Sequence, residues 1–392
     1  MKKFKFGLLP RILTAILFGI LTGLFLPLPI VRIFTTFNGL FGNFLQFLIP
    51  LIIVGLVTPA IAEIESGAGK LLVVTVVVAY LDTVFAGLFS YATSVTLFPS
   101  LIDAGGAVEV ADTGIDTKPY FTVSIPPVMD VMTSLVLAFV LGLGMATFRT
   151  EGLKKIADEF KTIISKTIET AIIPILPIYI FGIFLEMTCT GQAFRVLKVF
   201  IAIIGVIFVM HAVLLVFQYC VAGAVVKKNP FKLLGTMLPA YFTALGTASS
   251  AATIPVTLAQ TEKNGVSDEI AGFTIPLCAT IHLSGSALKI VACAVALMLM
   301  EGMPFNFGMF LGFIMMLGVM MVAAPGVPGG AIMAALGILA SMLGFGEQEQ
   351  ALMIALYITM DSFGTACNVT GDGAIALIMD KLFRNRKTSA SC

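Results

Sequence analysis

Long apolar stretches alternate with short charged segments along the whole chain. The apolar stretches cover residues 12–31, 33–62, 71–102, 131–148, about 167–185, 199–226, 233–261, 271–300, 302–346 and 350–379. A helix that crosses the hydrocarbon core of a bilayer needs about 20 predominantly apolar residues. Most of these stretches therefore predict single membrane-spanning helices.

Two stretches do not fit one helix each. Residues 246–253 place a small, polar run inside the stretch 233–261, and the Pro/Gly-rich residues 325–330 divide the stretch 302–346. Each stretch predicts two half-length helices joined by a tip inside the membrane, where protein or a water-filled cavity must satisfy the freed backbone groups. Paired interruptions of this kind indicate a transporter's binding site, although a Gly/Pro loop outside the bilayer is the alternative for each one.

Composition supports a membrane protein and excludes other classes. Charged residues make up 11% of the chain, against about 25% in soluble proteins, and the mean hydropathy is +1.05. The net charge of +1 and the lack of a basic tract argue against a nucleic-acid partner. The first stretch is longer than the core of a signal peptide and lacks a small-residue cleavage pattern, so we interpret it as the first span.

The distribution of basic residues predicts the topology. With both termini cytoplasmic and two re-entrant hairpins, eight spans remain, and 18 of the lysines and arginines fall inside. Only four fall outside: Arg32, Lys118, Arg195 and Lys198. The fold class expected is an all-α membrane protein with eight transmembrane helices and two re-entrant helical hairpins.

The last stretch carries polar side chains inside the membrane. Asp361, Thr365, Asn368 and Asp372 follow one another at intervals that place them on one face of a helix. Because an ionised carboxylate is costly inside a bilayer, this face is expected to point at a cavity, a cation or a basic partner. Solvation near the cytoplasmic surface is the alternative for Asp372.

A second polar set follows the first interrupted stretch. His282, Ser286 and Lys289 are spaced to share a helix face, and Ser284 marks a Ser/Gly-rich break that could present carbonyl oxygens to a cation. A buried lysine must find a carboxylate, lose its proton or bind an anionic substrate. Asp82, in the third stretch, is the candidate partner for Lys289.

These motifs resemble those of the dicarboxylate/amino acid:cation symporter family, which includes the glutamate transporters and archaeal aspartate-transporting homologues. The resemblance covers most of the chain and is carried by residues 248–255, 325–331 and 361–372. It implies inverted repeats, a homotrimer and an elevator mechanism. It divides the chain into scaffold helices 1–66, transport-domain helix 67–99, an outer loop 100–126, scaffold helices 127–190, and a transport domain 191–387 with hairpins at about 233–261 and 305–346.

The resemblance also implies roles for individual residues. Asp361 would hold a substrate amino group, Thr365 would contact the substrate side chain, and Asn368 would hold the carboxylate. The two tips would add donors to that carboxylate from Ser249, Ser250, Val327, Pro328 and Gly329. Asp372 would be a sodium ligand, together with Asn368, and no cofactor is implied.

Departures from the family pattern bear on substrate and coupling ion. The arginine that holds an acidic side chain is replaced by Gly364, and its alternative position is Ala248, which disfavours an acidic amino acid unless Lys289 or His282 substitutes. A sodium-binding carboxylate is missing from residues 282–286. We hypothesise that Lys289, opposite Asp82, replaces one sodium ion or that this pair couples protons. The residues expected to bind or couple cations are Tyr80, Asp82, Thr83, His282, Ser284, Ser286, Lys289, Asn368 and Asp372.

The sequence thus favours a symporter in the cytoplasmic membrane, surrounded by lipid, that moves a small carboxylate-bearing solute with sodium. Asp361 favours a neutral amino acid as that solute, and a proton- or sodium-coupled dicarboxylate symporter is the alternative. An anion channel is a further class. A hydrolase using Ser284 and His282 is disfavoured because their spacing places them on different helix faces, so no enzyme activity is expected.

Overall fold

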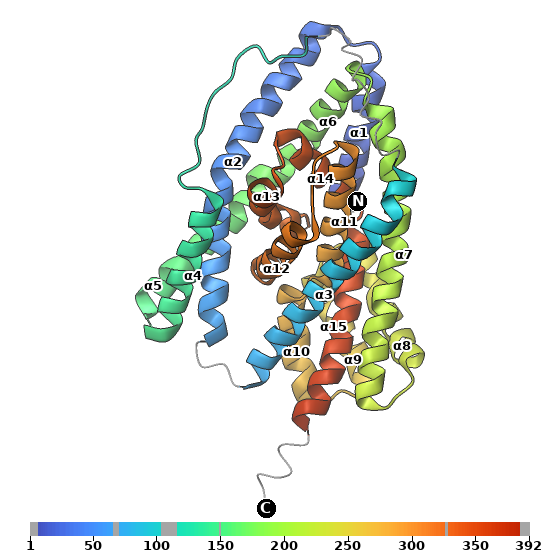
Figure 1. The fold of residues 1–392 in the computed structure, drawn as a ribbon. Coiled ribbons are helices and arrows are strands. Elements are labelled where there is room, and N and C mark those ends of the chain that lie inside the picture. Colours follow the sequence, from blue (N-terminus) through green and yellow to red (C-terminus); the bar gives the residue numbers. More distant parts are fainter. Residues whose placement is uncertain (1–6, 66–69, 103–115, 149, 326–327, 385–392) are drawn as a thin grey trace, which may run out of the picture.

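The computed structural model describes residues 7–65, 70–102, 116–148, 150–325 and 328–384 (Figure 1). These residues form helices and no strand. The α-helices of the first half are α1 (Leu8–Gly23), α2 (Leu28–Glu65), α3 (Lys70–Leu101), α4 (Val131–Phe148), α5 (Glu151–Thr167), α6 (Ile173–Cys189) and α7 (Ala193–Val226), with a π-helical turn, η1 (Ile168–Ile172), between α5 and α6.

The helices of the second half come in pairs. They are α8 (Pro230–Thr247), α9 (Ser250–Lys263), α10 (Asp268–Ile281), α11 (Ser284–Met300), α12 (Phe307–Ala323), α13 (Gly330–Leu343), α14 (Glu347–Thr359) and α15 (Asp361–Phe383). Each consecutive pair fills one of the last four apolar stretches. The broken segments are therefore concentrated in the C-terminal half of the chain.

Both predicted interruptions are confirmed as helix breaks. The first break lies between α8 and α9, where Ala248 is left-handed with φ of 49° and the Ser249 hydroxyl accepts a hydrogen bond from the backbone N–H of Ala252. The second lies between α12 and α13, where Gly329 has φ of 77°, a conformation that suits a residue without Cβ. The two halves of each pair pack against each other.

Two further breaks shape the polar interior. The chain leaves helical geometry at His282 and Leu283, between α10 and α11, as the Ser/Gly-rich sequence predicted. Helices α14 and α15 are bent by 62° with Met360 at the break. The sequence predicted one continuous helix there, which is wrong because Asp361 begins a new helix.

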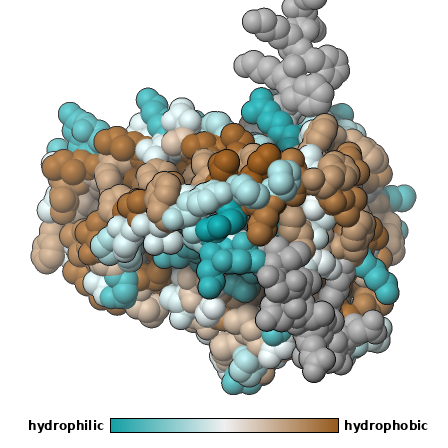
Figure 2. Space-filling model, turned by 90° about the horizontal axis from the view of Figure 1, so that it is seen from above, coloured by the Kyte–Doolittle hydropathy of each residue, from teal (hydrophilic) through white to brown (hydrophobic). Residues whose placement is uncertain are grey.

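Length and composition identify the chain as an integral membrane protein. Among the described residues six helical segments are long and apolar enough to cross a membrane, or seven if the bent pair α14 and α15 forms one span. Large apolar side chains such as Phe25, Phe148 and Phe231 lie exposed. Figure 2 shows hydrophobic residues over wide areas of the molecule, with hydrophilic residues gathered near the middle of that face. Exposed apolar surface of this extent suits contact with lipid.

The N-terminal helices pack around the C-terminal pairs. Helix α2 packs along α4, α1 packs along α6, and α3 packs along α11. Helices α12 to α14 lie toward the centre of the molecule in Figure 1, and α15 runs from there to the lower end of the bundle and contacts α7, α8, α9, α10 and α11. The polar face of α15 is thereby enclosed by other helices instead of facing the surroundings.

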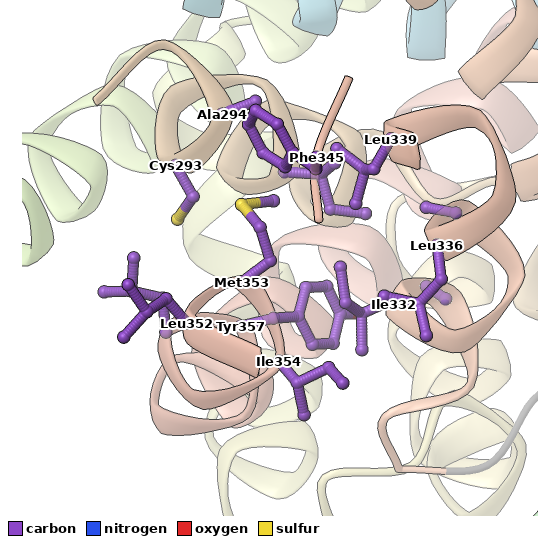
Figure 3. Close-up of a cluster of buried hydrophobic side chains, with 14 of the residues drawn as sticks. Cys293, Ala294, Ile332, Leu336, Leu339, Phe345, Leu352, Met353, Ile354 and Tyr357 are labelled. Carbon is purple, nitrogen blue, oxygen red and sulfur yellow. The ribbon is translucent and has the colours of Figure 1, made fainter. Parts of the chain in front are cut away.

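An apolar cluster packs α11, α13 and α14 together just before the beginning of α15. Figure 3 shows side chains of α11, α13 and α14 meeting in this cluster, among them Ala294, Ile332, Leu336, Met353 and Tyr357. All five are buried. Because Tyr357 lies only four residues before Asp361, this packing also helps to set the position of the first residue of α15.

Candidate functional site

Both hairpin tips reach one small cavity at the beginning of α15. The cavity has a volume of about 30 Å³, enough for about two water molecules. Its lining comes from the α8–α9 tip, the α10–α11 break, the α12–α13 tip, α14 and α15, and comprises Ala248, Ser249, Ser250, Ala279, Thr280, Leu283, Ser286, Pro325, Ala331, Tyr357, Asp361, Thr365 and Asn368. Elements far apart in the sequence thus converge on the predicted polar face.

The carboxylate of Asp361 is held from both sides. One oxygen, Oδ1, accepts a hydrogen bond from Lys289 Nζ at 3.2 Å, and the other, Oδ2, accepts one from the backbone N–H of Gly329 at 2.9 Å. Gly329 belongs to the second tip, so this carboxylate ties the tip to α15. Asp361 is only 6% exposed, which makes its two partners the main compensation for its lost hydration.

Lys289 lies in a fully buried position beneath this carboxylate. Its Nζ is 3.5 Å from the centroid of the Tyr357 ring and 3.3 Å from the carbonyl oxygen of Met360. Gly364 makes room for it, because a Cβ at that position would lie 2.7 Å from Nζ. The ammonium therefore has an ion pair, a cation–π contact and a carbonyl acceptor, all from α14, α15 and the residue between them.

The amide of Asn368 closes the break between α10 and α11. Its Oδ1 accepts hydrogen bonds from the backbone N–H groups of Gly285 at 2.8 Å and Ser286 at 3.2 Å. Its Nδ2 donates to the Ser286 hydroxyl, which also accepts a hydrogen bond from Tyr357 at 3.0 Å. Asn368 therefore satisfies backbone donors that the broken helix would otherwise leave unpaired.

A second polar cluster lies around Asp372, one helical turn beyond Asn368 on α15, and includes residues of α3, α7 and the α10–α11 break. His282 Nδ1 is 2.8 Å from Asp372 Oδ1, and its Nε2 is 2.8 Å from Asp82 Oδ2. Gln218 donates to the same Asp82 oxygen at 2.6 Å and to the Ser284 hydroxyl at 3.1 Å. An ionised carboxylate only accepts hydrogen bonds, so both ring nitrogens of His282 must carry protons if both aspartates are ionised.

The structure separates residues that the sequence analysis grouped. Lys289 pairs with Asp361 and not with Asp82, so the predicted Asp82–Lys289 pair is wrong. His282 and Lys289 do not share a helix face, because the chain breaks between them. Tyr80 donates to the carbonyl oxygen of Met315 on α12, directing its hydroxyl to that helix.

The remaining predicted residues keep local partners. Thr83 donates to the carbonyl oxygen of Ala79, and Thr365 to that of Asp361, where it lines the cavity. Pro328 lies beside Gly329 in the second tip, whereas Val327 lies outside the described residues. The sodium roles of Asp372 and Asn368 stay predictions.

Sequence reasoning missed two contributors. Tyr357 supplies the ring beneath Lys289, and its position four residues before Asp361 was the available signal. Gln218 orients Asp82, and it follows His211 by seven residues in the otherwise apolar α7. His211 also lies in α7, and its Nε2 is 3.0 Å from the Gly285 carbonyl oxygen.

A larger cavity of about 400 Å³ lies elsewhere, between residues of α2, α6 and α14 that include Asn38, Glu186 and Glu347. It contains none of the residues predicted for substrate or cations. The small cavity at the start of α15 is therefore the candidate site.

Known proteins resemble this chain over part of its length. The excitatory amino acid transporter 1 of Rattus norvegicus is 31% identical over 205 residues, 52% of this chain and 37% of the relative. The excitatory amino acid transporter of Caenorhabditis elegans is 26% identical over 252 residues, 62% of this chain and 49% of the relative. The chain thus spans less than half the length of these relatives.

The match to the family as a whole is longer. Residues 8–382 match the sodium:dicarboxylate symporter family, a family of transporters and not of enzymes. The match runs from α1 to the end of α15 and includes both broken hairpins and both polar clusters. The chain belongs to the sodium:dicarboxylate symporter family.

Proposed function

We propose that the protein is a secondary active symporter that couples uptake of a small carboxylate-bearing solute to sodium. The observation that carries this proposal is the convergence of both hairpin tips on the polar face of α15, around one small cavity inside an apolar bundle. Non-helical tips at membrane depth are a feature of transporter binding sites, where the freed backbone groups face substrate or ions. Solute would bind between the tips and Asp361, Thr365 and Asn368.

The proposal includes an architecture of eight spans, two re-entrant hairpins and two domains. Residues 1–66 and 127–190 would form the scaffold, and residues 67–99 and 191–387 would form the domain that moves as an elevator. The packing of α3 against α11, and of α2 against α4, supports this division. A homotrimer in the cytoplasmic membrane with both termini cytoplasmic completes the proposal, and the family membership supports it.

The backbone of the tips would provide donors for the solute carboxylate. Ser249 and Ser250 stand at the N-terminal end of α9, and Gly329 precedes α13. Helix N-termini favour anionic groups because their first N–H groups have no partner within the helix. Both tips are therefore suited to a carboxylate.

Two solute classes follow from the sequence. A neutral amino acid requires Asp361 to receive an ammonium group from the solute. The alternative is a dicarboxylate, which does not need Asp361 for an ammonium group; in the structure both oxygens of Asp361 accept hydrogen bonds from within the protein. Sodium would travel as a co-substrate, with Asp372 and Asn368 as its proposed ligands, and protons are the alternative coupling ion.

Uptake into proteoliposomes tests the proposal. Succinate, malate, lactate, alanine, serine and aspartate would each be offered under an inward sodium gradient, under an inward proton gradient and with choline replacing sodium. A symporter gives saturable uptake that exceeds equilibrium, depends on one cation gradient and exchanges internal for external solute. Uptake that neither saturates nor exchanges would indicate a channel, and lack of uptake for every solute would refute the proposal.

A further inference from the structure

The paired charges beneath the candidate site carry information about the solute. Asp361 is the only Asp or Glu among the described residues that line the cavity, so it is the available carboxylate for a solute ammonium group. Its Oδ1 is paired with Lys289 and its Oδ2 with the N–H of Gly329. The carboxylate therefore already has a cation and a backbone donor.

Several neighbouring groups hold the Lys289 side chain in this position. Lys289 is fully buried, and its ammonium contacts the Tyr357 ring, the Met360 carbonyl and Asp361 at the same time. Gly364 is the residue that permits this, because a Cβ there would lie 2.7 Å from Nζ and 2.8 Å from Cε. Four neighbours thus define the place of one ammonium group.

The charge balance of the cavity then decides which solutes fit. Lys289 and Asp361 together are neutral, so a solute ammonium would be transferred from water to a site whose single carboxylate is already compensated. Burying a charge without a free partner is strongly unfavourable. A solute without an ammonium group has no such charge to bury there, and its carboxylate can use N–H groups at the helix N-termini of the tips other than that of Gly329, which is donated to Asp361.

We infer that the Lys289 ammonium takes the place of a solute amino group on Asp361, and that the protein carries small carboxylates without an amino group. This inference rests on the proposed function, since it concerns the solute of the same site. Dicarboxylates, hydroxy acids and keto acids satisfy it, whereas α-amino acids do not. Lys289 and Asp361 are then specificity-determining residues.

Matched solutes that differ at one group test the inference. The pairs are lactate with alanine, glycerate with serine, and malate with aspartate. In each pair the amino acid carries an ammonium group where the hydroxy acid carries its α-hydroxyl group. Binding to the purified full-length chain would be measured by calorimetry, and transport by competition in proteoliposomes. The hydroxy acid of at least one pair should bind more tightly than its amino acid by at least about tenfold, the effect of one buried unpaired group.

A variant pair provides the second arm. Lys289→Met removes the ammonium and frees one oxygen of Asp361, so the preference should shift toward the amino acid of the pair. The double variant Lys289→Met/Asp361→Asn removes both charges, leaves no unpaired buried ion and should lose the shift. If Lys289→Met does not fold, the wild-type comparison of matched solutes still decides the inference.

The outcomes distinguish this inference from the proposed function. Sodium- or proton-driven uptake in which amino acids bind as well as their hydroxy counterparts would overturn the inference and leave the symporter proposal standing. An unchanged preference in a folded Lys289→Met protein would also overturn it. Lack of transport for every carboxylate would refute the proposed function and the inference with it.

Discussion

The fit between Gly364 and Lys289 gives the sharpest quantitative prediction. In Gly364→Ala the added methyl group would lie 2.7 Å from Nζ, 2.8 Å from Cε and 3.3 Å from Cδ of Lys289. Carbon atoms in ordinary contact are about 3.5–4.0 Å apart, so the lysine must move by about 1 Å. Lys289 is fully buried, which leaves it little space for that movement.

The expected cost follows from opposing terms. Overpacking a filled interior costs about 1–3 kcal/mol, and alanine instead of glycine inside a helix contributes about 0.5–1 kcal/mol of stability. If the lysine stays paired, the net loss is up to about 2.5 kcal/mol. If the movement separates it from Asp361, the loss approaches about 3–5 kcal/mol, the cost of breaking a buried ion pair.

Unfolding of the purified protein by a denaturing detergent, followed by circular dichroism, measures this loss. Gly205→Ala is the matched control, because Gly205 also lies within a helix but a Cβ there would have nothing within 4 Å. Gly205→Ala should be neutral or slightly stabilising. A Gly364→Ala protein as stable as Gly205→Ala would refute the proposed position of Lys289.

Three other predictions concern the two polar clusters. Lys289→Met and Asp361→Asn should each lower the free energy of unfolding by about 3–5 kcal/mol, and the double variant should lose less than their sum; strictly additive losses in detergent unfolding would contradict the ion pair. Tyr357→Phe, which removes the hydrogen bond to Ser286, should lower the free energy of unfolding by about 1 kcal/mol. Tyr357→Leu should lower it by about 0.5–2 kcal/mol more, because it also removes the ring that contacts the Lys289 ammonium; equal unfolding midpoints for these two variants would argue against that contact. His282→Gln should destabilise the protein by leaving two carboxylates without their shared partner, and sodium chloride should restore more stability than choline chloride; equal recovery in thermal melts would count against a cation-binding role for the cluster.

Much of the fold could be predicted from local sequence signals. The apolar stretches gave the long helices, and the small polar run before Pro255 and the Pro/Gly run at residues 325–330 predicted both hairpin breaks. The break at Met360 could not be predicted, because residues 350–379 contain no proline and are compatible with one helix. The bend is set by packing of α14 against α11 and α13 and by the contacts of Asp361.

The sequence indicated which intramembrane polar residues matter individually, but not which of them pair. Helical spacing identified Asp361, Asn368 and Asp372 as a polar face. Lys289 and His282 were identified because an ionisable residue in an apolar stretch indicates a functional role. The sequence indicated the wrong partner for Lys289, since both Asp82 and Asp361 are carboxylates within apolar stretches. Nothing local in the sequence distinguishes them.

By itself the sequence determined that this is a membrane protein with two interrupted hairpins and a small set of intramembrane charges. Only the tertiary structure decided how those charges combine. Lys289 meets Asp361 across 72 positions of the chain, and His282 meets Asp82 across 200. Periodicity reports which side chains share a face of one helix, whereas a contact between helices depends on how the whole bundle packs, including the space that Gly364 leaves for one ammonium group.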